Sequence, residues 1–362
     1  MKRAPLVLLL GLVACAPNRG EGFERSVNDA RAAYGAGRFD EAAQRWDDAA
    51  KRAKVPRDAV YARYEAALAR ARAGDVAGGA AALRKIADEN VEYSAEAAYK
   101  AADLSFKVDP AAGYRELEAM ALRFPDSPYA RVALERLIRH DDEAGAATAM
   151  ARLDAFAPKV QGKSLEMDVA YERAKRLEAM GRHEQARDSF IAVANQWPYP
   201  KGNYFDDALF RAAEIEEKLQ RPNEAIALLE RMLQYRETSV TIGSYERPRY
   251  IPAMLKIAAI YEDQLHDRGK ARDAYHRLYT EFKTSTLRDD ALWREADLWT
   301  KDGDTDKACA RLDTLVSNLP DSRYVPCAID RCKSIERPKD SKAPRTCHAY
   351  LLREPVRPDD PK

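Results

Sequence analysis

The cysteines are the residues whose positions in this sequence say most about chemistry. Apart from Cys15, they occur only at Cys309, Cys327, Cys332 and Cys347, close to the C-terminal end. An even number confined to one region indicates two disulfides if the chain is exported to an oxidising compartment. Of the three possible connectivities, we expect Cys309 to pair with Cys327 and Cys332 with Cys347. The first bond would stabilise the fold by about 3 kcal/mol on the chain-entropy estimate.

A zinc site is the alternative interpretation of the same cysteines. Four residues separate Cys327 from Cys332, and His348 directly follows Cys347, so thiolate and imidazole ligands gather in one segment. An oxidising compartment favours disulfides over free thiolates. The sequence therefore predicts no metal site and no cofactor.

The remaining cysteine, Cys15, follows a segment typical of secretion. Lys2 and Arg3 precede the apolar run of residues 6–13, which is too short to cross a bilayer as a helix. Residues 12–15, Leu-Val-Ala-Cys, resemble the lipobox of bacterial lipoproteins. The resemblance implies cleavage before Cys15, a lipid on its thiol and acylation of the new amino group. A cysteine that follows an ordinary signal peptide by chance is the alternative.

This resemblance predicts a signal peptide over residues 1–14 and a lipidated tether over residues 15–23. Two or more acyl chains anchor a protein firmly, whereas one chain binds only marginally. The residue after Cys15 is Ala16 rather than aspartate. In Gram-negative sorting, that implies lipid anchoring in the outer membrane, and we expect the chain to face the periplasm.

Sequence patterns that carry catalysis are missing. The five histidines show no H-E-x-x-H or other metal-ligand spacing, and there is no G-x-S-x-G, P-loop or G-x-G-x-x-G motif. The pairs Asp206–Asp207 and Asp289–Asp290 precede predicted helices, where acids satisfy free amides and the helix dipole. Lys and Arg (60) balance Asp and Glu (59), so no basic face for nucleic acid is indicated. We predict neither an enzyme with a small-molecule substrate nor a nucleic-acid-binding protein.

A repeated pattern of small and apolar residues organises the rest of the chain. One small residue per unit, here called the anchor residue, opens each repeat of the pattern. The anchor residues are Ala42, Gly79, Gly113, Ala146, Ala186, Ala225, Ala271 and Ala308. Four and seven residues after each anchor the residue is apolar, like the buried stripe of an amphipathic helix.

A second set of residues, here called the facing residues, lies twelve positions before the anchors. They are Ala30, Ala67, Ala101, Leu134, Ala174, Ala213, Ala259 and Ala296. Two antiparallel helices approach closely only where side chains are small, so the two sets together predict stacked helix hairpins. An ordinary alanine-rich helical bundle is the alternative.

The spacing and landmarks of these units resemble the tetratricopeptide repeat. That repeat has a period of about 34 residues with Gly, Ala, Phe and Pro landmarks, and the anchors here are 33 to 46 residues apart. The resemblance covers residues 24–336 and implies an all-α, right-handed superhelical solenoid of about eight hairpins. Residues 337–362, rich in proline and charge, are predicted to be partly disordered.

Two copies of one turn support a comparison with envelope lipoproteins. Residues 124–130 read F-P-D-S-P-Y-A, and residues 319–325 read L-P-D-S-R-Y-V. Proline ends one helix, and Asp or Ser caps the next. The phrase resembles the inter-repeat turns of the barrel-assembly lipoprotein. In its class of role the chain is also similar to the pilotins of type IV pilus secretins.

A stacked array offers an extended surface for a peptide or protein. The expected function is therefore a lipid-anchored scaffold that binds protein partners in outer-membrane biogenesis, secretion or motility. A peptidoglycan-linked organiser is the alternative, and an enzyme accessory is a weaker one. The insertion at residues 236–249 could touch a partner or be a longer solvated loop. Candidate partner-binding residues are Tyr61, Tyr64, Tyr99, Tyr171, Phe210 and Trp293 on first helices, and Val240, Ile242 and Tyr245 in the insertion.

Overall fold

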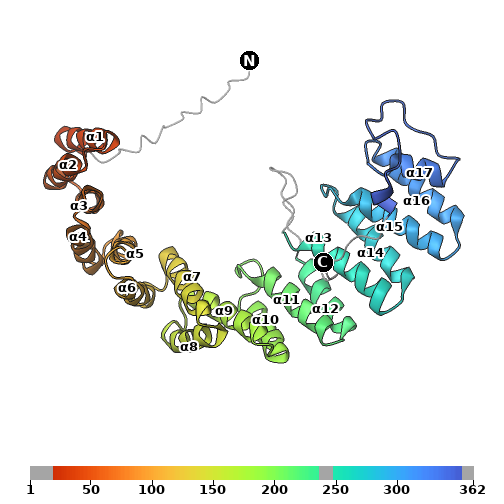
Figure 1. Ribbon diagram of the computed structural model, residues 1–362, viewed down its shortest axis with the longest axis horizontal. Coiled ribbons are helices and arrows are strands. Elements are labelled where there is room, and N and C mark those ends of the chain that lie inside the picture. Colours follow the sequence, from red (N-terminus) through yellow and green to blue (C-terminus); the bar gives the residue numbers. More distant parts are fainter. Residues whose placement is uncertain (1–18, 236–247, 353–362) are drawn as a thin grey trace, which may run out of the picture. The chain divides into compact units, whose positions relative to one another are not determined.

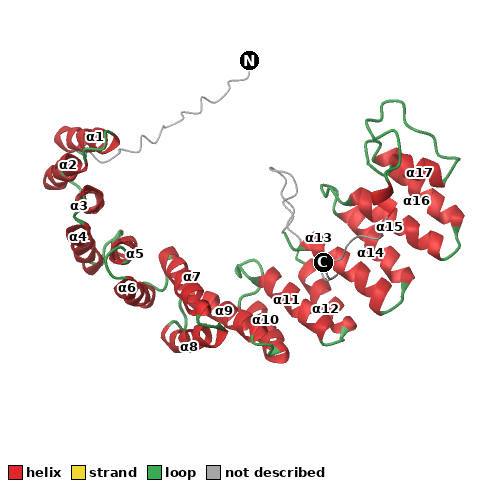
Figure 2. Cartoon of the chain, in the orientation of Figure 1, coloured by secondary structure: helices red, strands yellow, loops and turns green. Residues whose placement is uncertain are grey.

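The computed structural model describes residues 19–235 and 248–352, and these ranges consist of helices joined by turns and loops, without strands (Figure 2). Cys15, Val240, Ile242 and Tyr245 lie outside the described residues. The α-helices are α1 Glu21–Gly35, α2 Phe39–Arg52, α3 Pro56–Ala73, α4 Val76–Asp88, α5 Ser94–Ser105, α6 Pro110–Arg123, α7 Pro128–Glu143, α8 Ala146–Phe156, α9 Leu165–Ala179, α10 His183–Gln196, α11 Phe205–Lys218, α12 Pro222–Leu233, α13 Tyr250–Ala259, α14 Arg268–Glu281, α15 Arg288–Lys301, α16 Thr305–Asn318 and α17 Val325–Arg331. Three short segments are the 3₁₀-helices η1 Ala157–Lys159 and η3 Ala349–Leu352 and the π-helix η2 Ile260–Gln264.

Helices α1 to α16 follow one another as eight hairpins in the described part of the chain, as predicted (Figure 1). Odd-numbered helices are the first helices of the hairpins, and even-numbered helices are the second. The chain divides into two compact units, residues 1–169 and 170–362, and the division falls inside α9. Within each unit, every hairpin packs on its sequence neighbours, which is the architecture of a helical repeat solenoid.

The anchor residues show directly why the crossings need small side chains. A Cβ added to Gly79 would lie 2.7 Å from the carbonyl oxygen of its facing residue, Ala67. At Gly113, an added Cβ would lie 2.6 Å from the ring of Phe106. Distances this short are repulsive, so a larger residue at either position would force its neighbour to move. The predicted contact between anchor and facing residue is confirmed at Gly79, whereas the close neighbour of Gly113 is the ring of Phe106 rather than its facing residue, Ala101.

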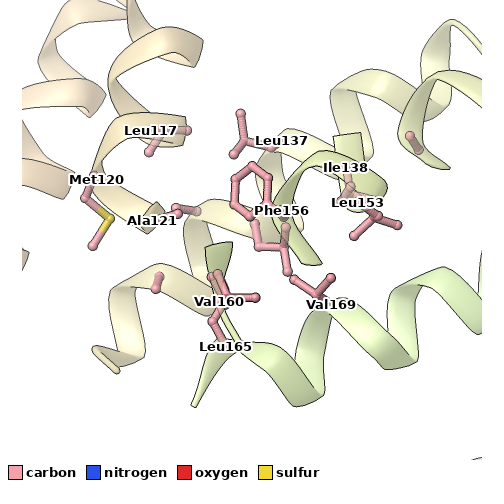
Figure 3. Close-up of a cluster of buried hydrophobic side chains, with 14 of the residues drawn as sticks. Leu117, Met120, Ala121, Leu137, Ile138, Leu153, Phe156, Val160, Leu165 and Val169 are labelled. Atoms are coloured by element: carbon pink, nitrogen blue, oxygen red, sulfur yellow. The ribbon is translucent and has the colours of Figure 1, made fainter. Parts of the chain in front are cut away.

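The fourth hairpin corrects the predicted register by three residues. Ala146 is half-exposed at the first position of α8, whereas Ala149, Leu153 and Phe156 are fully buried. Figure 3 shows Leu153 and Phe156 within the cluster of apolar side chains between neighbouring hairpins. The anchor of this unit is therefore Ala149. The prediction chose Ala146 because the start of α8 contains several alanines, and only their burial in the fold distinguishes them.

The seventh hairpin corrects the predicted facing residue by one position. Ala258 is fully buried, and Ala259 is only half-buried. Directly after Ala259 the helix continues as the π-helix η2, in which the N–H of Leu265 donates to the carbonyl of Ile260 at 3.0 Å. A π-turn adds one residue to a helix, so the spacing from Ala258 to the anchor Ala271 is thirteen residues instead of the predicted twelve.

The proline-rich tail is folded as far as the structure describes it, to Leu352. Ala343 and Leu351 are buried, and the guanidinium of Arg337 donates to the carbonyl of Pro344 at 2.8 Å. In the described ranges, no helix combines the length and apolarity needed to cross a bilayer.

Candidate functional site

Four of the predicted partner-binding aromatics are buried between successive hairpins. Each lies three residues before its facing residue, and its side chain is between 4% and 6% exposed. They are Tyr64, Tyr171, Phe210 and Trp293. Residues from the segment that leads into the next first helix cover them. Between ring centroids, Tyr93 lies 5.7 Å from Tyr64, Tyr204 stacks 4.0 Å from Tyr171, and Tyr324 stacks 4.9 Å from Trp293. The guanidinium carbon of Arg249 lies 4.8 Å from the ring centroid of Phe210. These aromatics therefore hold neighbouring repeats together, and their side chains are not open to a partner.

The other two first-helix aromatics, Tyr61 and Tyr99, are half-buried. Tyr61 makes an edge contact with Trp46 at 5.5 Å between ring centroids, and Tyr99 lies at the same distance from Tyr129. Part of each ring remains accessible in the first unit.

A more complete polar arrangement surrounds Asp207 in the second unit. Its carboxylate accepts hydrogen bonds from the hydroxyl of Tyr171, from Nε of Arg211 at 2.8 Å and from Nε of Arg249 at 2.8 Å. The three donors come from α9, α11 and the segment just before α13, so one carboxylate joins three successive first helices. Burial acts to raise the pKa of Asp207, but these hydrogen bonds outweigh it and hold the pKa below its usual value.

Charged groups beside Asp207 remain partly open to water. The side chain of Glu214 is 37% exposed and that of Arg249 is 39% exposed. Lys256 lies 3.9 Å from Glu214 and packs above the ring of Phe210. Partial burial raises the pKa of Glu214, against the opposing effect of Lys256 and the nearby arginines. We call Asp207, Arg211, Glu214, Arg249 and Lys256 the α11–α13 face.

Ion pairs between successive first helices position this face. Arg211 reaches back to Glu178 at 3.2 Å, and Lys256 reaches back to Glu217 at 2.7 Å. Both cations lie two residues before a facing residue, and both acids lie four residues after the previous one. The sequence contains a signal for these ion pairs. It is a cation two residues before one facing residue together with an acid four residues after the previous facing residue.

The acidic pairs have a role that the sequence did not predict. Asp207 and Asp290 lie in the first turns of α11 and α15, six residues before their facing residues. Asp290 accepts from the guanidinium of Arg323 at 2.5 Å and from the hydroxyl of Tyr324 at 2.7 Å. Each therefore binds an arginine from the segment before the next first helix, in addition to lying near free helix amides.

The disulfides are confirmed as two in number, but the predicted pairing is wrong. Cys309 pairs with Cys332, and Cys327 pairs with Cys347, with Cα atoms 5.7 Å and 4.6 Å apart. Cys309 in α16 bonds to Cys332 at the end of α17, and Cys327 in α17 bonds to Cys347 in the tail. The packing of these segments, rather than distance along the chain, therefore selects the partners. No cluster of His, Cys, Asp and Glu side chains among the described residues could hold a metal ion.

One surface hollow brings histidine and carboxylates together, beside the turn between η2 and α14. Glu262, His266 and Asp302 line it. Glu262 pairs with Lys301 at 2.9 Å, and Asp302 pairs with Arg268 at 2.8 Å. Hydrogen bonds from Arg268 and Arg272 lower the pKa of Asp302, so this acid stays ionised and is poorly suited to proton transfer.

Comparison with known proteins identifies the repeat. The sequence model of the tetratricopeptide repeat matches residues 207–239 and 290–322, which contain most of the hairpins α11/α12 and α15/α16. No curated protein matches the chain.

Solved structures of similar architecture share little sequence with the chain. A tetratricopeptide repeat protein from Parabacteroides merdae is 11% identical over 76% of this chain and 99% of its own, with a TM-score of 0.33. Pseudomonas aeruginosa pilF is 14% identical over 77% and 99%, with a TM-score of 0.34. A signal-transduction ATPase from Pyrococcus horikoshii with a tetratricopeptide repeat sensor is 13% identical over 86% and 48%, with a TM-score of 0.41.

These likenesses are too distant to transfer a partner or an activity. The family match, the anchors and the hairpins agree on the architecture, which is that of protein-interaction scaffolds. Residues 207–239 and 290–322 match the tetratricopeptide repeat, and the described part of the chain is a helical repeat solenoid.

Proposed function

We propose that this protein is a lipid-anchored scaffold that binds a protein or peptide partner during assembly of a bacterial envelope structure, such as an outer-membrane, secretion or motility machine. The lipid anchor would be on Cys15, at the periplasmic face of the outer membrane. The lipobox-like residues 12–15 support the anchor, and the tetratricopeptide repeats support the scaffold.

The observation that carries the binding function is the α11–α13 face. Its charges are fixed by bonds between repeats, so little side-chain entropy would be lost when a partner binds them. Glu214 and Arg249 keep more than a third of their side chains exposed, while Phe210 beneath them supplies apolar support. A peptide with both charged and hydroxyl groups fits such a mixed surface.

A photoreactive amino acid in place of Glu214 tests this binding in living cells. Ala227, exposed on the second helix α12, is the matched control position. The proposal predicts that position 214 crosslinks to a defined envelope protein and that position 227 does not. Equal yields of the same product from both positions would show that the face is not a specific site.

The lipid anchor is tested separately by Cys15→Ser. We expect the variant to fold, with an unchanged melting temperature, and to leave the membrane fraction for the soluble fraction. Persistence of the variant in the membrane fraction would contradict acylation of Cys15.

A further inference from the structure

A surface of the first hairpin lies where the described chain begins. The few residues between Cys15 and Arg19 limit how far this surface can lie from Cys15. We propose that this surface, formed by Arg52 and Lys54 beside Arg19, contacts the membrane and binds the phosphate groups of anionic phospholipids. The inference rests on the proposed acylation of Cys15 and adds to it which end of the repeat array lies on the bilayer.

The start of the described chain is fixed to the first two hairpins. Nε of Arg19 donates to Oδ2 of Asp58 at 2.7 Å, and Asp58 is only 9% exposed, at the start of α3. The same guanidinium lies 5.0 Å from the ring centroid of Phe23, which is 1% exposed in α1. Arg19 is therefore held by a buried acid and a buried ring, and the chain leaves the fold at a defined place.

The tether beyond that place is short. Three residues lie between Cys15 and Arg19, and a chain of this length spans at most about 14 Å from one Cα to the other. If the acyl chains of Cys15 lie in the bilayer, the tether keeps the Arg19 end of the first hairpin within that distance of the headgroups. The opposite end, at the turn between α1 and α2, lies farther away by about the length of α1, or roughly 22 Å.

Two exposed cations lie at the tethered end of the first hairpin. Arg52 and Lys54 are exposed and form no ion pair with other described residues. Aliphatic carbons of Lys54 and Arg52 lie 3.1 Å and 3.7 Å from where a Cβ would stand on Gly20 and Gly22. Both cations thus border the exit point of the chain, where a headgroup phosphate can accept their hydrogen bonds.

Acidic groups at the same end limit the range of this attraction. Glu21 and Glu24 lie in the first turn of α1. The net charge of this end is therefore small, and binding depends on direct contact with headgroups, which the short tether enforces.

Two positions on α2 measure which end touches the membrane. Asp40 and Lys51 are both exposed and lie eleven residues apart, on the same face of α2 but about 16 Å apart along its axis. A fluorophore on Asp40→Cys or Lys51→Cys, attached after the native disulfides form, reports contact with nitroxide-labelled lipid. In vesicles that contain phosphatidylglycerol, we expect quenching at position 51 at least about threefold that at position 40. Equal quenching, or stronger quenching at position 40, would overturn the proposed orientation.

A longer tether separates headgroup binding from tether length. Twelve Gly and Ser residues inserted between Asn18 and Arg19 remove the distance constraint. We expect the preference for position 51 to persist in this variant and to disappear when Arg52→Gln and Lys54→Gln are added. An identical quenching ratio with and without the two glutamines would show that the cations do not bind phosphate.

Incorporation of labelled palmitate distinguishes this inference from the function on which it rests. Acylation of the native chain, together with equal quenching at positions 40 and 51, would refute the membrane-contact surface alone. Absence of acylation would refute both the anchor and the surface.

Discussion

The two copies of the P-D-S turn have nearly the same sequence but are followed by different structures. After the turn at residues 124–130 the array continues, and the segment before α9 packs against it: Asp126 accepts from the N–H of Ser164 at 2.8 Å, and the carbonyl of Pro125 accepts from Leu165. After the turn at residues 319–325, the structure describes α17 and the segment up to Leu352.

The tail makes contacts with the second turn like those that residues 164 and 165 make with the first. Asp321 accepts from the N–H of Lys342 at 2.7 Å, and the carbonyl of Pro320 accepts from the hydroxyl of Ser341. At the first copy, helix packing holds the partner segment in place. At the last copy, the disulfide between Cys327 and Cys347 holds it.

Removing that disulfide should have the largest effect on this comparison. Cys327→Ser combined with Cys347→Ser opens a loop of about twenty residues and should cost about 3 kcal/mol. Hydrogen exchange should accelerate at Lys342 and in α17, while amides near Asp126 keep their protection. Unchanged exchange at Lys342 would show that the tail does not depend on the disulfide.

The two aspartates should differ next. Asp126→Ala removes the acceptor for Ser164 and should cost about 1 kcal/mol, measured by urea unfolding. Asp321→Ala should cost less, because the disulfide keeps the tail near its site without the hydrogen bond. Adding Asp321→Ala to the double-serine variant should restore its full cost, and equal costs in both backgrounds would contradict this coupling.

The pH dependence of the first turn follows from the same contact. The N–H of Ser164 donates to Asp126 and lowers the pKa of that carboxyl. A lowered pKa stabilises the fold above the usual aspartate value, and the contribution is lost as pH falls through the folded value. The difference in stability between native protein and Asp126→Ala should therefore shrink below about pH 4. A difference that stays constant to pH 2 would contradict the ionised acceptor.

The serines of the two turns should show the smallest difference. Ser127 caps α7 by accepting from the N–H of Tyr129 at 3.2 Å, so Ser127→Ala should cost about 0.5–1 kcal/mol. Ser322 accepts from Tyr324 and also donates to Asp289 at 2.7 Å. Ser322→Ala should therefore be the more costly of the two, as thermal unfolding can determine.

The sequence predicted the hairpins well because small residues at crossings leave a periodic trace. It failed where two small residues compete, as at Ala146 and Ala149, and where a π-turn adds one residue before Ala271. Neither the choice between two alanines nor the π-turn can be recognised from residue composition. Burial alone distinguishes the alternatives.

The candidate site was harder to predict because its residues come from three repeats. Tyr171 and Phe210 were correctly placed on first helices. The residues that pack over their rings, Tyr204 and Arg249, lie between 33 and 39 residues further along the chain. An aromatic residue on a helix face gives no sign that the next repeat will bury it. The disulfide partners were missed for the same reason, since sequence distance does not report which helices touch.

The account rests on hairpins that meet at small side chains, because the α11–α13 face and the contacts between the tail and the turn at residues 319–325 both depend on that packing. Urea unfolding of Ala213→Leu tests it most directly, with Ala227→Leu on the exposed side of α12 as the control. We expect a loss of about 1–3 kcal/mol for Ala213→Leu, from overpacking a fully buried crossing, and within about 0.5 kcal/mol of no change for the control. An unchanged free energy of unfolding for Ala213→Leu would contradict the account.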